Sequence, residues 1–192
     1  MPDPNPAALD FLLTRRSRPA KTLTTPVPDN DTVKTLLTAA ARSPDHGKLE
    51  PWRFVVLEKP ALQRLADLAQ TRGDALGLDH DQTAKGVAQY ANADLAIAVV
   101  SSPKPSEKIP QIEQSLSAGA VCLALLNAAL AAGWGANWLT GWASHEPTFR
   151  TEGLGLEPHE SIAGLIHLGT ETAKPPERPR PDLDAITTWV AR

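Results

Sequence analysis

One apolar run constrains the fold of this chain more than any other feature. From Ala118 to Trp134 the only strongly polar side chain is Asn127, and Ala, Gly and Leu dominate the run. A membrane-spanning helix needs about 20 predominantly apolar residues, and this run is shorter. We therefore expect a fully buried central helix rather than a membrane span. Its small residues would let another backbone approach closely, which suits the middle of a domain or a subunit interface.

Composition narrows the class of protein further. At 192 residues the chain fits a single domain, residues 1–192. A net charge of −3 is too balanced for a protein that coats nucleic acid or an anionic membrane, so neither partner is expected. The single cysteine, Cys122, excludes an intramolecular disulfide and a multi-thiolate metal site. Residues 1–10 lack the basic cluster and apolar run of a signal peptide, so a cytoplasmic location is expected.

Capping signals and hydrophobic spacing predict the order of the elements. Asn5-Pro6 predicts the start of a first helix that ends near Arg15, and Asp29 or Asn30 predicts the start of a second. Further helices are expected from Pro60, over 82–91 and over 111–132, with strands over 53–57, 94–100, 137–140 and 162–168.

This order predicts an α+β or mixed α/β protein. Because helices separate the strands, we expect at least some strand pairs to be parallel. The polar, glycine-containing stretch Arg72–Asp81 reads as a mobile loop, and the proline-dense segment Lys174–Pro181 must be extended.

The basic cluster Arg15-Arg16-Ser17-Arg18 follows the first helix and has two interpretations. Guanidinium groups and a hydroxyl could converge on a phosphate dianion. Alternatively, the arginines could form a solvated helix C-terminus, where positive charge opposes the helix dipole. The spacing alone leaves both open.

Other signatures of catalysis are missing from the sequence. The five histidines show no spacing typical of a metal site. The sequence contains no Walker loop, no Gly-x-Ser-x-Gly and no Gly-x-Gly-x-x-Gly after a strand. The Gly133-Trp134-Gly135 segment follows a helix, so it does not support a Rossmann dinucleotide site.

Four segments, taken in their order, resemble the short branch of the FMN-dependent nitroreductase family. The first is Arg15-Arg16-Ser17, and the second is Ala41-Arg42-Ser43-Pro44 leading to Pro51-Trp52. The third is the apolar helix with Gly133-Trp134-Gly135 and then Gly141, and the fourth is His167-Leu168-Gly169-Thr170 before a Lys/Arg/Pro tail. The resemblance spans nearly the whole chain.

The resemblance implies a set of flavin-contacting residues and no catalytic side chain, since the flavin carries the chemistry. It implies that Arg15 and Ser17, with Arg16 near them, hold the phosphate and ribityl chain of FMN. It also implies roles for Arg42 and His46 beside the flavin of the same or the partner subunit, for the backbone of Trp138, Leu139 and Thr140 along the ring and phosphate, and for Lys174 and Arg178 in closing the phosphate pocket.

The same resemblance implies fold, assembly and activity. The expected fold is α+β, a mixed sheet surrounded by helices, in a homodimer with two FMN sites at its interface. The apolar helix would lie in that interface, and residues 171–192 would form an extended arm across the other subunit. NADH or NADPH would deliver hydride to the flavin, and a nitroaromatic or quinone-like small molecule would accept two electrons in a ping-pong reaction.

Two alternative functions stay open. The chain could be a flavin enzyme of this fold with other chemistry, such as dehydrogenation or dehalogenation, or a flavin-binding module without activity. Two residues also depart from patterns seen in the family. Glu50 stands where many members have glutamine before Pro51-Trp52, and Leu139 stands where some short members have arginine. We expect Glu50 either to influence the flavin or to face solvent.

Overall fold

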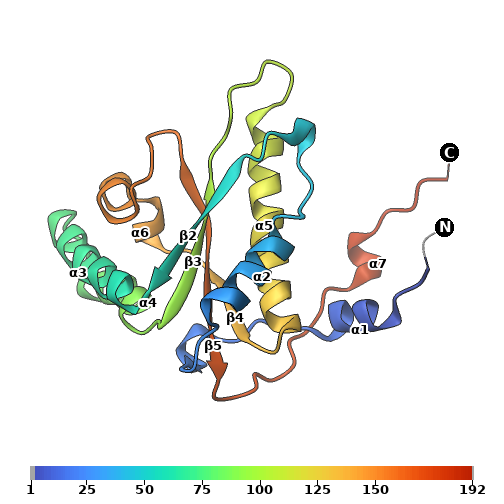
Figure 1. The fold of residues 1–192 in the computed structure, drawn as a ribbon, viewed down its shortest axis with the longest axis horizontal. Coiled ribbons are helices and arrows are strands. Elements are labelled where there is room, and N and C mark those ends of the chain that lie inside the picture. Colours follow the sequence, from blue (N-terminus) through green and yellow to red (C-terminus); the bar gives the residue numbers. More distant parts are fainter. Residues whose placement is uncertain (1–2, 192) are drawn as a thin grey trace.

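The computed structural model describes residues 3–191, which form a five-stranded sheet with helices on both faces (Figure 1). The strand order is β1-β5-β3-β2, with β4 also paired with β5. The central strand β3 is buried along its whole length. The strands are β1 (Leu23–Thr24), β2 (Trp52–Glu58), β3 (Leu95–Ser101), β4 (Gly135–Leu139) and β5 (Ser161–Glu171).

The α+β class is confirmed, but the expectation of parallel pairs is wrong. Every strand pair between residues 3 and 191 is antiparallel. Two successive helices connect β2 to β3, and three reversals, one before, one between and one after these helices, bring the chain back beside β2 in the opposite direction. A single helix connects β3 to β4, which therefore run in the same direction, but β5 lies between them. The single-helix crossover that favours a parallel pair thus joins two strands that are not neighbours.

The helices divide between the two faces of the sheet. One core cluster joins α3, α4 and α6 to the sheet, and the other joins α2 and α5. As expected, the side chains of Asn5 and Asp29 cap α1 and α2. The helices are α1 (Pro6–Thr14), α2 (Asn30–Ala40), α3 (Lys59–Ala75), α4 (His80–Ala91), α5 (Gln111–Ala131), α6 (Trp142–His145) and α7 (Leu183–Ile186).

The loop expected over Arg72–Asp81 is instead mostly helical. α3 continues to Ala75, and α4 begins at His80. Gly73 is a poor helix former, but it is buried on the same side of α3 as Ala69. A Cβ on Gly73 would lie 2.6 Å from the Thr83 methyl group of α4. The close packing of the two helices therefore overrides the weak local propensity.

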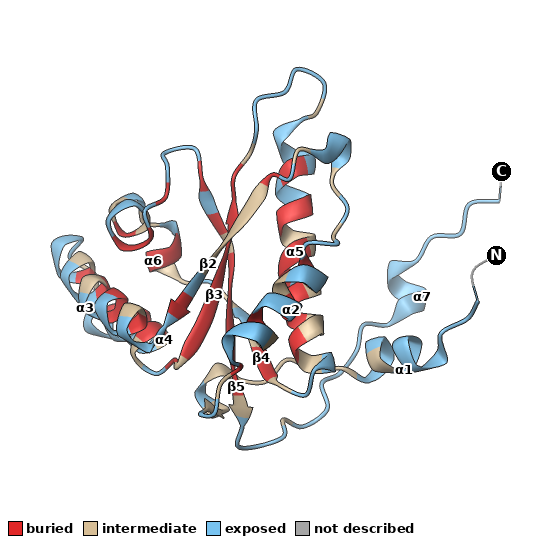
Figure 2. Cartoon of the chain, viewed as in Figure 1, coloured by how far each residue is buried: buried red, intermediate tan, exposed pale blue. Residues whose placement is uncertain are grey.

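Helix α5 contains the apolar run and is the central helix of its face. Among the described helices, α5 is the one whose length and apolar composition would be sufficient to cross a membrane. Its inward side chains, including Val121, Cys122 and Leu125, are buried against the sheet, as expected for a core helix (Figure 2). Its outward face leaves Ile112 and Leu116 about two-thirds exposed, which makes this face apolar as well.

The two ends of the chain project beyond the helix–sheet layers on the α5 side (Figures 1 and 2). Leu9, Leu12 and Leu13 of α1 are exposed, and so are Trp189 and Val190 near the C-terminus. Residues 174–182 contain no helix or strand, as their prolines predict. Both ends therefore offer apolar side chains that the rest of the described chain does not cover.

Candidate functional site

A cationic hollow lies where α1 ends and β4 begins. It has a volume of about 730 Å³. Its walls bring the residues after α1 together with the C-terminal end of α5 and with the start of the C-terminal tail. The lining residues are Phe11, Thr14, Arg15, Arg16, Arg18, Leu130, Gly133, Trp134, Gly135, Glu171, Lys174, Pro175 and Glu177.

The arginines of this hollow differ in how they are paired. Arg18 forms an ion pair of 2.6 Å with Glu171, and its N–H donates to the Ala136 carbonyl, so it fastens the loop to β4. Arg15 Nη2 donates to Ser17 Oγ at 3.3 Å. The buried atoms Arg15 Nε and Arg16 Nη1 have no hydrogen-bond partner within the described chain.

Charge in the hollow is correspondingly unbalanced. Burial, with added repulsion from Arg180 and Arg16, lowers the pKa of Arg15 below its ordinary value. Buried N–H donors normally find an acceptor, and guanidinium donors match phosphate oxygens. The donor set therefore fits an anion such as a phosphate. Lys174 lines the same hollow, whereas Ser17 is not among its lining residues and contacts it only through its hydrogen bond with Arg15.

A second hollow lies at the other end of β4. It has a volume of about 360 Å³. The Trp142 indole N–H donates to the Gln82 carbonyl at 3.0 Å and fixes one wall. The buried Nε2 of Gln89 has no hydrogen-bond partner within the described chain. The lining residues are Leu78, Gln82, Lys85, Gly86, Gln89, Thr140, Gly141 and Trp142.

Strand β4 connects the two hollows. From Gly135 to Thr140 the extended chain covers about 17 Å, a span comparable with an extended flavin mononucleotide. Among the described strands β4 pairs only with β5, so its other edge is open beyond the point where Arg18 contacts Ala136. Peptide groups alternate along a strand, so the Trp138 peptide points the same way as that of Ala136. The backbone segment predicted to contact a flavin thus joins the cationic hollow to the second hollow, beside Gln89.

Arg42 and His46 lie elsewhere in the chain. Both are exposed and lie in the loop between α2 and β2. His46 Nδ1 is 2.6 Å from Glu113 Oε2, at the N-terminal end of α5. From Glu113 to Gly133 the helix axis covers about 30 Å. One chain therefore does not bring Arg42 and His46 to its own cationic hollow.

Of the two tail residues predicted to bind phosphate, only one lies at the cationic hollow. Lys174 lines the cationic hollow, whereas Arg178 is exposed and is not among the lining residues. Arg180 instead acts on Arg15 electrostatically and pairs with Glu177 at 2.8 Å. A tail with several arginines separated by prolines does not indicate which of them turns inward.

Sequence reasoning missed Lys85 and Gln89. They stand one turn apart on α4, in a pattern typical of an exposed helix face. Only the position of α4 beside the end of β4 brings them together with Thr140. Glu50 is exposed, and its N–H donates to Asp45 Oδ2 at 2.9 Å.

Burial shifts the pKa of two other potentially reactive side chains, Cys122 and His167, so that both are uncharged at neutral pH. Burial raises the pKa of Cys122 to about 12, so its thiol stays protonated at neutral pH. Burial lowers the pKa of His167 to about 4, so this histidine is neutral at the same pH. Among residues 3–191 no group of three potential metal ligands comes together.

Comparison with known proteins gives a consistent result. The model of the nitroreductase family matches residues 12–170. The candidate NAD(P)H nitroreductase YdjA of Escherichia coli (strain K12) is 34% identical over 167 residues, which cover 87% of this chain and 90% of YdjA. A candidate NAD(P)H nitroreductase of Haemophilus influenzae is 34% identical over 169 residues, 87% of this chain and 90% of that protein.

Solved structures agree in fold. A nitroreductase-like family protein from Bacillus cereus superimposes with a TM-score of 0.80 at 22% identity, over 100% of this chain and 99% of that one. A candidate nitroreductase from Desulfovibrio desulfuricans, solved in complex with FMN, gives 0.72 at 23% identity, over 98% of both chains.

Proposed function

This chain belongs to the nitroreductase family, and we propose that it is an FMN-dependent oxidoreductase that transfers electrons from NAD(P)H to nitroaromatic or quinone-like acceptors. Bound FMN would supply the redox chemistry, accepting hydride from the nicotinamide and giving two electrons to the acceptor. The observation that carries the proposal is the pair of buried guanidinium N–H groups, on Arg15 and Arg16, that lack an acceptor in a cationic hollow.

We place one FMN along the open edge of β4. Arg15, Arg16, Ser17 and Lys174 would hold its phosphate, with Arg178 able to join them from the tail. The backbone of Trp138, Leu139 and Thr140 would lie against the ring. Lys85 and Gln89 would meet the polar edge of the ring, where the free Nε2 of Gln89 can donate to a carbonyl oxygen and the lysine can stabilise negative charge.

Arg42 and His46 would reach a flavin only on a second subunit. In a symmetric homodimer with α5 helices running in opposite directions, the N-terminal end of one α5 meets the C-terminal end of the other. Each flavin would then lie between the cationic hollow of one chain and the His46 loop of its partner. The exposed apolar residues Ile112 and Leu116 on α5 are suited to that interface.

The C-terminal arm also has a receiving surface. β2 is an edge strand, and a groove of about 480 Å³ runs beside it, lined largely by apolar side chains that include Val33, Leu37 and Val56. We propose that the partner's arm, with Trp189 and Val190, docks there. Deleting residues from 181 onward should loosen the dimer in sedimentation and lower FMN occupancy together. An equally tight dimer with full FMN occupancy would rule out this role.

The assembled protein would be a cytoplasmic homodimer of single FMN-binding domains, residues 1–192, with a ping-pong reaction. In such a reaction the oxidised coenzyme would leave before the acceptor enters. The first test is whether purified protein is yellow and releases FMN in acid. Next, anaerobic NAD(P)H should bleach the colour, and a nitroaromatic or quinone should restore it. Flavin without bleaching would indicate a binding module instead.

Replacing Thr140 by proline tests the backbone contact separately. Proline removes the N–H at 140 and restricts residue 139. We expect this variant to fold but to purify without flavin, while Leu139→Met retains it. A yellow Thr140→Pro variant with normal turnover would contradict the placement along β4.

A further inference from the structure

A third hollow lies at the opposite end of the molecule from the cationic one. It is a groove of about 680 Å³ between the loop that follows β3 and the turn that precedes β5. Three prolines, at positions 103, 105 and 158, stiffen its walls. The polar residues that line it are Lys104, Ser106, Gln111, Gln114 and His159.

Lys104 is held in place by its backbone. Gln114 of α5 is only 4% exposed, and its amide makes two bonds to that residue. The Lys104 N–H donates to Gln114 Oε1 at 2.7 Å, and Gln114 Nε2 donates to the Lys104 carbonyl at 3.0 Å. The loop is therefore fastened to the helix without using the lysine side chain.

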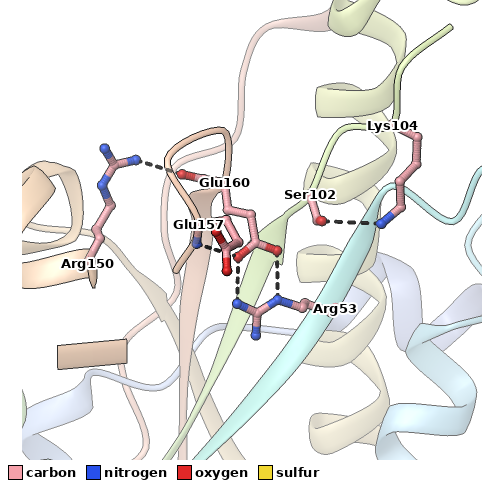
Figure 3. Close-up of polar contacts among 6 residues, drawn as sticks. All are labelled: Arg53, Ser102, Lys104, Arg150, Glu157 and Glu160. Atoms are coloured by element: carbon pink, nitrogen blue, oxygen red, sulfur yellow. Dashed lines mark hydrogen bonds and ion pairs between the residues drawn. The ribbon is translucent and has the colours of Figure 1, made fainter. Parts of the chain in front are cut away.

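The opposite wall is also fixed, by the cluster in Figure 3. Arg53 donates two hydrogen bonds, of 2.7 and 2.6 Å, to the carboxylate of Glu160. The same carboxylate accepts from the Glu157 N–H at 3.0 Å, and Arg150 donates to the Glu160 carbonyl at 2.9 Å. The turn that carries His159 is thus anchored at both ends.

The groove keeps its positive charge available. The Lys104 ammonium is 3.4 Å from Ser102 Oγ and forms no ion pair with the described residues. None of the described lining residues is acidic. Fixed walls, a lysine, an imidazole and the Ser106 hydroxyl together suit a phosphate on an extended organic ligand.

The position of the groove suggests which ligand. Gly47 packs directly on Ile109, since a Cβ at position 47 would lie 2.6 Å from Ile109 Cδ1. His46 contacts Glu113, the neighbour of Gln114 on α5. The groove therefore begins at the loop that faces the partner's flavin in the proposed dimer.

We propose, building on the function above, that this groove binds the adenosine-side phosphates of the nicotinamide coenzyme. The nicotinamide must stack on the flavin beside His46, and the rest of the coenzyme must continue outward over the protein. Lys104 would contact one of its phosphate groups, with His159 and Ser106 completing the site. Lys104 is then a specificity-determining residue for the coenzyme.

The experiment compares Lys104→Met with Lys108→Met in the FMN-loaded dimer. Lys108 is an exposed lysine of the same loop that does not line the groove, so it controls for the loss of one charge. Steady-state rates are measured with NADPH, NADH and reduced nicotinamide mononucleotide, which lacks the adenosine side. FMN content is measured in each variant.

We expect Lys104→Met to raise the KM for NADPH about tenfold, with kcat, FMN content and the KM for the mononucleotide unchanged. Lys108→Met should leave all of these within twofold of wild type. An equal rise in the KM for NADH would assign the contact to the diphosphate, and a rise confined to NADPH would assign it to the 2′-phosphate.

A KM for NADPH within twofold of wild type in Lys104→Met, or an equal rise in Lys108→Met, would overturn the inference. If the mononucleotide still reduces the flavin, the proposed function survives that result. If wild-type protein binds no FMN, or oxidises none of the three donors, the proposed function fails and this inference fails with it.

Discussion

Two arginine clusters lie at the two ends of β5, and they differ in whether their charge is balanced. Beside the N-terminal end, Arg53 faces the carboxylate of Glu160 in a bidentate pair. Beside the C-terminal end, Arg15 and Arg16 hold buried donors without acceptors. A cluster that supplies its own anion contributes to stability, whereas a cluster that lacks one is suited to binding. Arg15 and Arg16 belong to a basic run in the sequence and Arg53 does not, but only the pairing in the fold shows which cluster is left without an anion.

The largest expected effect is on the balanced cluster. Glu160→Gln leaves Arg53 facing a neutral amide at a site where the carboxylate is 4% exposed. We expect the free energy of unfolding to fall by about 3 kcal/mol, with FMN affinity changed less than threefold. Denaturant titration and flavin fluorescence measure the two quantities. Glu157→Gln, an exposed carboxylate in the same turn, is the control. A Glu160 variant as stable as that control would show that the pair adds no stability.

Arg15→Ala should lower the affinity for FMN and leave the free energy of unfolding without FMN undiminished. Loss of a charge-assisted contact to a dianion costs about 1.5–3 kcal/mol, roughly ten- to a hundredfold in FMN affinity. Stability without FMN should be unchanged or higher, because a desolvated cation next to other cations is removed. Lys21→Ala, an exposed lysine nearby, should have neither effect. Unchanged FMN affinity in Arg15→Ala would remove the basis for the phosphate site.

The balanced cluster and a second buried group, His167, should lower the stability of the protein over different ranges of acid pH. The Arg53 guanidinium, acting against burial, lowers the pKa of Glu160 to about 2. Its stabilisation is present above the ordinary pKa near 4.5 and is lost as pH falls toward 2. His167, with a pKa lowered to about 4, binds a proton in the unfolded chain first, so stability falls between pH 6.5 and 4.

Substitution of His167 can isolate that second contribution. His167→Gln should flatten the upper part of the pH dependence by about 1–2 kcal/mol and leave the lower part intact. The measurement is the midpoint of urea unfolding from pH 7 to pH 3. An unchanged profile between pH 6.5 and 4 would show that His167 is not the group responsible.

The smallest expected effect concerns Glu50. This exposed carboxylate shares a loop with His46, which would face the partner's flavin. Glu50→Gln should raise the potential of the bound flavin by the equivalent of about 0.5 kcal/mol, because one negative charge at moderate distance is removed. Identical potentials and half-reaction rates in the two proteins would place Glu50 in solvent.

The sequence alone predicted much of the scaffold because local rules governed it. Asn5 and Asp29 cap helices whose apolar spacing was regular, and β2, β3 and β5 contain short apolar runs. Strand direction was missed because it depends on which strands become neighbours, and β5 enters the sheet from the far end of the chain. The extent of α3 was missed because the packing of Gly73 on α4 is a tertiary contact.

The residues of the candidate site also depend on tertiary contacts that the local sequence does not show. Arg15 and Lys174 lie far apart in sequence, and only the fold brings them together in one hollow. Gln89 carries no local signal, since an amide on a half-exposed helix is ordinary. It stands out only once the end of β4 lies beside it and its Nε2 is left without a partner.

The length of α5 has a genetic consequence. If each flavin site takes Arg15 from one chain and His46 from the other, a defect in either residue damages both sites of a pure homodimer. A mixed dimer of Arg15→Ala and His46→Ala chains would instead concentrate both defects in one site and restore the other completely. Two inactive alleles expressed together should therefore complement each other, regaining activity that neither recovers alone.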